Sequence, residues 1–187
     1  MTASTRLPAP PPGSAWAPRR PGEPRAIDAG TFALATLPTS PFWARRYMRQ
    51  FLDSCRGICI DTADTAELLV SELVTNSVRF ASGPVPAHEY SGRVNAGIIW
   101  LSVRHFATGL LIEVFDTDAN PPVFTDPAED AESGRGLFIV DSLSMKWSYF
   151  FPAGGGKVVY CFIAIPQASG PCGTGYGTGR APPDRAE

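Results

Sequence analysis

Residues 71–81 read SELVTNSVRFA, a stretch in which polar and apolar residues alternate at helical spacing. Glu72, Asn76 and Phe80 are spaced four residues apart, so on a helix they form one ridge. That ridge lies at the edge of an apolar stripe, where a carboxylate and an amide need hydrogen-bonding partners. The spacing alone is common, however. Taken by itself, it favours a solvated Glu and a capping-type Asn near a helix end.

The stretch belongs to a longer amphipathic helix, which we predict over residues 62–80. Its inward positions recur at helical spacing, and they are Ala66, Leu69, Val70, Leu73, Val74 and Ser77. A preceding helix is predicted over residues 41–56, with Ser40 as its cap and Pro41 in its first turn. Its apolar positions are expected near one inward face; they are Phe42, Trp43, Tyr47, Phe51 and Leu52.

The other segments alternate between strand and helix patterns. Strands are predicted over residues 31–37, 97–105, 110–116, 146–151 and 157–165, and a short helix over residues 135–143. The order is then strand, two helices, two strands, helix, two strands. This order predicts an α+β two-layer sandwich, in which the helices cover one face of a mixed, mainly antiparallel sheet.

The two ends of the chain differ in composition from the middle. Residues 1–29 are rich in Pro, Ala and Arg, and residues 167–187 are rich in Gly and Pro. Such segments bury too little apolar surface to offset the entropy lost on ordering them. We therefore expect two disordered tails and one folded domain over residues 30–166.

Charge and hydropathy exclude several classes of protein. The 187 residues carry a net charge of −2, whereas a nucleic-acid-binding surface needs a strong basic excess. The chain has neither a long apolar run nor an apolar N-terminal segment, so we expect no membrane span, no secretion and a cytoplasmic location.

The four cysteines and two histidines suggest no metal site from their spacing. Cys55 and Cys59 suit one helix face better than a zinc site, because no second pair or histidine cluster lies nearby. Reduced thiols without a special role are expected in the cytoplasm. His105 has no partner in any motif.

Two further signals follow the ridge along the chain. Asp116 ends the apolar strand LLIEVFD, where a carboxylate can accept hydrogen bonds from an exocyclic amine. After a long loop at residues 117–133, the segment ESGRGLFIV opens the short helix. Glycines at that position let the backbone approach a ligand, and free N–H groups at the helix start favour an anion. An Asp turn and a flexible junction are the ordinary alternatives.

Taken in this order, the three signals resemble the GHKL ATPase superfamily, whose structure is called the Bergerat fold. SELVTNSVRFA and GGGKVVYCFI, the latter at residues 154–163, are most similar to the stand-alone anti-sigma-factor serine kinases of actinobacterial type. The resemblance extends over residues 31–165 and implies that the chain binds ATP and Mg²⁺.

The resemblance also implies roles for single residues. Asn76 matches the magnesium ligand, Glu72 the acidic residue proposed as catalytic base, and Asp116 the adenine-binding carboxylate. The loop at residues 117–133 matches the lid. The phosphate-binding turn is matched by Gly134, Arg135, Gly136 and Leu137.

Two positions depart from the pattern of that superfamily. Asp118 stands where many members have a glycine, which removes backbone freedom and adds a charge. Val158 stands where many relatives have a threonine that helps bind adenine. Neither departure removes Asn76, Asp116 or the glycine turn.

The resemblance implies a serine/threonine kinase that phosphorylates a small antagonist protein and sequesters a sigma factor, with homodimerisation expected by analogy. The alternative is a module that binds ATP or a partner with little or no kinase activity, which Asp118 and Val158 motivate. A histidine kinase is disfavoured, since no long helix with a phospho-accepting His precedes the domain.

Overall fold

The computed structural model describes residues 24–81, 97–123 and 135–166. These ranges contain five strands and three helices. Seven of the eight begin and end within two residues of the predicted segments, and the first strand begins three residues earlier than predicted. In chain order they are β1 (Asp28–Ala35), α1 (Ser40–Ser54), α2 (Ile60–Ala81), β2 (Ile98–Phe106), β3 (Gly109–Asp116), α3 (Gly136–Leu143), β4 (Lys146–Phe150) and β5 (Lys157–Ala164).

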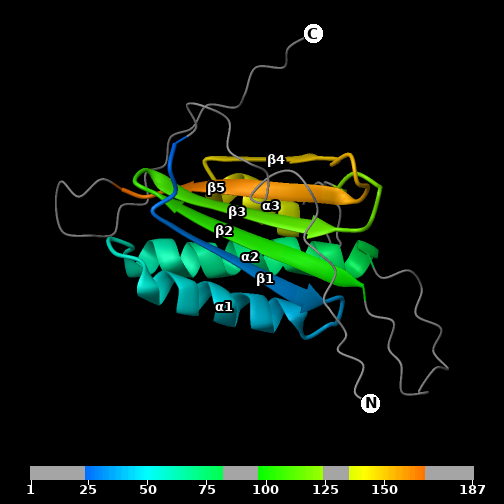
Figure 1. Cartoon of the computed structure of the whole chain (residues 1–187), viewed down its shortest axis with the longest axis horizontal. Coiled ribbons are helices and arrows are strands. Elements are labelled where there is room, and N and C mark those ends of the chain that lie inside the picture. The colour runs from blue at the N-terminus through cyan, green and yellow to red at the C-terminus, as the bar shows by residue number, and fades with distance from the viewer. Residues whose placement is uncertain (1–23, 82–96, 124–134, 167–187) are drawn as a thin grey trace, which may run out of the picture.

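The strands form one sheet in the order β1-β2-β3-β5-β4, and the helices lie together on one of its faces (Figure 1). The predicted α+β sandwich is therefore confirmed. The sheet differs from the expected mixed one in a single respect, since all four strand pairings in the described residues are antiparallel. None of the helices in these ranges is both long and apolar enough to cross a bilayer.

The first strand begins two residues before the expected domain start at residue 30. Asp28 lies opposite His105 in the β1–β2 ladder, and the Ile27 N–H donates to the His105 carbonyl at 2.7 Å. Composition does not reveal this boundary, because it is set by pairing with a strand distant in the sequence. Residues 1–23 and 167–187, the greater part of the two expected tails, lie outside the described residues.

The inward stripe of α2 is buried as its spacing predicts. Each of its six predicted positions, Ala66, Leu69, Val70, Leu73, Val74 and Ser77, is at most 1% exposed. Glu72 and Asn76 are half-buried beside this stripe, and Phe80 is exposed. The ridge that suggested a site therefore lies at the edge of the core, where a ligand can reach it.

The prediction for the inward face of α1 was wrong in part. The buried positions are Ser40, Ala44, Met48 and Leu52, whereas Phe42 and Trp43 are about half exposed. These buried residues recur every four positions, and their small to medium side chains fit the close contact between α1 and α2. The bulkier aromatic side chains lie at the edge of that contact. Leu52 alone among the predicted positions is fully buried.

Ser40 does not cap α1 as predicted. It is the first residue of the helix, and Thr39 in the cap position makes no side-chain capping bond. The Ser40 hydroxyl instead donates to the carbonyl of Ala35 at the end of β1. Ser40 therefore ties the start of α1 to the sheet.

Two core-facing columns of the sheet end in polar residues. Along β2, alternate side chains lead through buried Leu101 and Val103 to His105. Along β3, they lead through buried Ile112 and Val114 to Asp116. Because β2 and β3 are antiparallel, these two ionisable groups mark opposite ends of one apolar core.

Candidate functional site

Asp116 is fully buried at the end of β3 and pairs with a buried lysine. Lys157, the first residue of β5, lies directly opposite Asp116 in the ladder, so both side chains are on the same face. The Lys157 Nζ is 2.8 Å from Asp116 Oδ1, and the lysine side chain is only 1% exposed. The two side chains form a buried ion pair.

Asp118 completes this cluster. Its Oδ2 lies 2.7 Å from Lys157 Nζ, and its backbone N–H donates to Asp116 Oδ1 at 3.0 Å. Burial favours a higher pKa for Asp118, but hydrogen bonds from Lys157 and Asn120 outweigh it and hold the pKa below its usual range. Asp118, which stands where a glycine was expected, thus supplies a second carboxylate to the buried Lys157.

The second oxygen of Asp116 lies buried without a partner. Asp116 Oδ2 accepts no hydrogen bond from any described residue. A buried acceptor left unsatisfied costs about 1–3 kcal/mol, so the position favours a ligand that brings an N–H donor. An exocyclic amine such as that of adenine satisfies this requirement.

Glycine at position 156 lets the turn before β5 close over Asp116. Gly156 has a φ of +73°, a conformation that residues with a Cβ rarely adopt. A Cβ there would collide with the Asp116 carbonyl oxygen and would lie 2.8 Å from the Phe115 ring. The glycine run before Lys157 therefore shapes the backbone around the aspartate.

Glu72 lies against the start of α3. A Cβ added to Gly136 would be 2.7 Å from Glu72 Oε2, so a side chain at this position would displace the carboxylate from the start of α3. Burial raises the pKa of the Glu72 carboxyl, and the charge of Arg45 acts in the opposite direction. The structure thus brings a half-buried carboxylate of α2 to the helix start that the sequence marked for phosphate.

The other predicted site residues differ in exposure. Asn76 is half-buried one helical turn after Glu72, Arg135 is exposed before α3, and Leu137 is buried in the core. Leu137 can therefore reach a ligand only through its backbone, whereas Arg135 presents its side chain to solvent. Gly134 and most of the expected lid lie outside the described residues.

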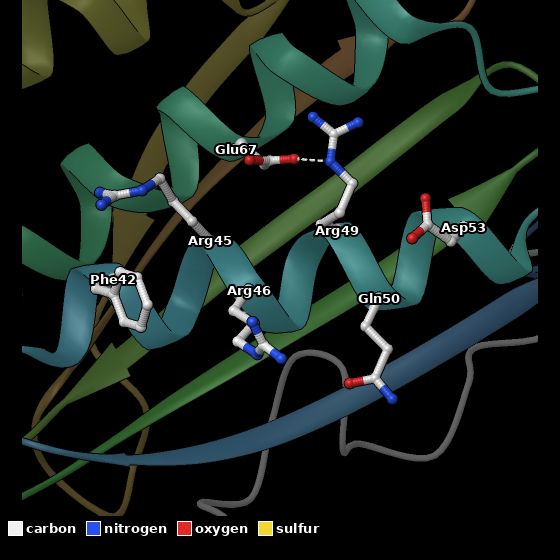
Figure 2. Close-up of a pocket in the computed structure, with 7 residues that line it drawn as sticks. All are labelled: Phe42, Arg45, Arg46, Arg49, Gln50, Asp53 and Glu67. Atoms are coloured by element: carbon white, nitrogen blue, oxygen red, sulfur yellow. Dashed lines mark ion pairs between the residues drawn. The ribbon is translucent and has the colours of Figure 1, made fainter.

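A groove of about 640 Å³ runs along the outer side of α1 and is lined by Phe42, Arg45, Arg46, Arg49, Gln50, Asp53 and Glu67 (Figure 2). Arg49 pairs with Glu67 and, at 2.6 Å, with Asp64 of α2. Arg45 Nη1 lies 2.6 Å from Ser71 Oγ, and its charge acts on Glu72. The groove is thus connected to the candidate site through Arg45.

Neighbouring glycines allow the closure over Asp116 to be tested. Gly155 has a φ of +87° and open space around it, so Gly155→Ala introduces only backbone strain, about 1–2 kcal/mol. Gly156→Ala adds a collision with Asp116 and Phe115 to that strain. We expect it to destabilise the protein by about 1–3 kcal/mol more, as overpacked sites do. Urea denaturation of both variants measures the difference. Equal free energies of unfolding would contradict this role of Gly156.

Comparison with known proteins places this geometry in a family. Residues 36–161, more than half of the chain, match the histidine kinase-like ATPase domain. Among solved structures, the histidine kinase domain of the blue-light activated histidine kinase from Erythrobacter litoralis EL346 matches at 19% identity with a TM-score of 0.40. The match covers 68% of this chain and 60% of that one. A search of curated proteins gave no match. On the family match, this chain belongs to the histidine kinase-like ATPase domain family.

Proposed function

We propose that this chain binds Mg-ATP and transfers its terminal phosphate to a serine or threonine of a small antagonist protein. The observation that carries the proposal is the buried Asp116 carboxylate. Its Oδ1 accepts hydrogen bonds from Lys157 and the Asp118 N–H, and its Oδ2 has no donor among the described residues. Family membership supports ATP as the ligand.

The adenine end of the nucleotide belongs at Asp116 in this proposal. Lys157 shares its charge between Asp116 and Asp118, so the three groups together carry a net negative charge. Such a site suits an amine donor and disfavours phosphate. Val158 is buried on β5 and supplies no hydroxyl to the base, so recognition relies on the carboxylate itself.

The phosphate end belongs at the start of α3. The first N–H groups of a helix lack partners within the helix and attract anions. Gly136 brings this helix start against Glu72, and Arg135 precedes it with an exposed side chain. Asn76 would hold Mg²⁺ through its side-chain oxygen, because Mg²⁺ takes oxygen ligands. The metal would neutralise charge on the phosphates.

Glu72 acts as the base in the proposed transfer. A new bond forms between phosphorus and the acceptor hydroxyl oxygen, the bond to the leaving ADP breaks, and the hydroxyl proton passes to Glu72. The raised pKa of Glu72 suits this role, because a base works best when its pKa approaches the working pH. The same serine kinase resemblance leads us to propose sequestration of a sigma factor as the regulatory output.

Magnesium ligation can be tested on Asn76 and its neighbour. We expect Asn76→Ala to weaken Mg-ATP binding about tenfold or more, because the metal loses its only proposed side-chain ligand. Thr75→Ala, at the adjacent half-buried position, is the control and should bind normally. Calorimetric titration with ATP, in Mg²⁺ and in EDTA, separates the contribution of the metal to binding from that of the nucleotide. If the Asn76 variant keeps the full Mg²⁺ dependence, the ligand assignment is wrong.

Kinase activity can be tested by following labelled phosphate from ATP to candidate antagonist proteins. We expect transfer to a serine or threonine, and a loss of about 10²–10⁴-fold in Glu72→Gln, the usual contribution of a general base. Glu67→Gln, on the same helix but in the groove, should retain activity. Intact ATP binding without transfer to any candidate would favour the alternative function, a nucleotide-dependent binding module.

The pH profile of the transfer tests the environment of Glu72. The base must be ionised, so the transfer rate falls as the pH drops through the pKa of Glu72. Because burial raises this pKa, the fall occurs at a higher pH than the ordinary carboxyl pKa of 4.5 would give. Arg45→Ala removes the charge that lowers this pKa, and we expect the acid limb to move to still higher pH. Arg46→Ala, one residue along, serves as the control for lost surface charge. Identical profiles in the two variants would exclude Arg45 as the group that tunes Glu72.

A further inference from the structure

We propose that Asp28, Cys55 and His105 form a binding site for one zinc ion, at the end of the sheet opposite the nucleotide site. Each residue contributes one donor atom, and the three atoms lie within 4.8 Å of one another. This cluster is separate from every residue assigned above to ATP or magnesium.

Three different elements build the cluster. Asp28 opens β1 and lies opposite His105 of β2 in the ladder, which places His105 Nδ1 3.0 Å from Asp28 Oδ2. Cys55 is the first residue after α1, and its backbone there is extended. The end of the helix therefore brings a thiol over the pair of strand residues.

The donor set fits zinc better than the other common divalent ions. Zinc is bound by thiolate, imidazole and carboxylate, whereas Mg²⁺ and Ca²⁺ take oxygen ligands almost alone. Ordinary zinc–ligand bonds in a tetrahedron place donor atoms about 3.3–3.6 Å apart. All donor pairs here lie within 4.8 Å, so they reach that range after closing by at most about 1 Å.

Burial gives the site a closed side and an open side. The His105 side chain is 5% exposed and Cys55 is half-buried, while the Asp28 side chain is 39% exposed. The open side leaves a fourth position for water, as in zinc sites with three protein ligands. Burial, then the charge of Asp28 and a hydrogen bond to it, raise the pKa of the Cys55 thiol to about 11. Zinc would displace the thiol proton on binding.

The occupied site would connect three parts of the fold. The metal would join the start of the edge strand β1, the end of β2 and the end of α1. Ligand binding to the folded state alone raises its stability. Zinc should therefore raise the melting temperature of the protein.

The test uses full-length protein made without a polyhistidine tag and stripped with a chelator. We expect about one equivalent of Zn²⁺ per chain, measured by elemental analysis after gel filtration, and a rise in melting temperature. Substitution with Co²⁺ should give a thiolate-to-metal charge-transfer band. Less than half an equivalent of zinc in the wild-type protein would overturn the proposal.

Variants identify the ligands. Cys55→Ser should abolish the charge-transfer band and weaken zinc binding at least about tenfold, while Cys59→Ser keeps both. Cys59 is the matched control because it lies four residues along, near Thr62 at the start of α2. Asp28→Asn, at a half-exposed position, should also weaken binding while preserving the fold by circular dichroism. Unchanged zinc affinity in Cys55→Ser, or loss of the band in Cys59→Ser, would overturn the assignment.

A final measurement distinguishes zinc binding at this cluster from metal binding at the nucleotide site. We expect zinc binding to persist in excess Mg²⁺ and in Asn76→Ala, because neither involves a donor of the cluster. Loss of the zinc equivalent in Asn76→Ala would show that the metal occupies the magnesium position instead, and would overturn the proposal. The zinc measurement needs no kinase activity, so failure of the proposed function leaves it interpretable.

Discussion

The ion pair between Lys157 and Asp116 is the constraint on which the candidate site depends. Both side chains are essentially without solvent contact, and a single buried charge at either position would be strongly unfavourable. The pairing needs β5 beside β3 in one register, and it needs glycine at position 156 so that the turn can follow Asp116. Asp118 adds a second carboxylate 2.7 Å from Lys157 Nζ and leaves the cluster with a net negative charge. The sheet order and the chemistry of the site are therefore linked.

This constraint also gives the site a direction. The Asp116 end is rich in acceptors and net negative, and the start of α3 presents N–H donors near Glu72. A ligand that is neutral and amine-bearing at one end and anionic at the other matches both ends at once. ATP has this polarity. If ATP bound in the opposite orientation, its phosphates would lie against the carboxylates of Asp116 and Asp118. Coulomb repulsion strongly disfavours such a contact in a buried site.

The sequence predicted those features that depend on local periodicity. The stripe of α2 and the limits of the strands other than β1 follow from spacing within one segment, and the structure agrees with them closely. The face of α1 was harder to assign, because bulky aromatic residues suggested a core position that smaller side chains occupy instead. The order of motifs indicated Asn76, Asp116 and the turn before α3 as candidate site residues. It did not predict Lys157, because nothing local indicates that residue 157 lies across from residue 116.

The same reasoning explains why the Asp28, Cys55 and His105 cluster has no signature in the sequence. Its members are 27 and 50 residues apart, counted from 28 to 55 and from 55 to 105. They meet only because β1 pairs with β2 in one register and α1 ends above that pair. Cysteine spacing detects metal sites whose ligands share a loop or helix. A site assembled at the end of a sheet requires the register, and in this fold both ends of the apolar core, at Asp116 and at His105, carry such an assembly.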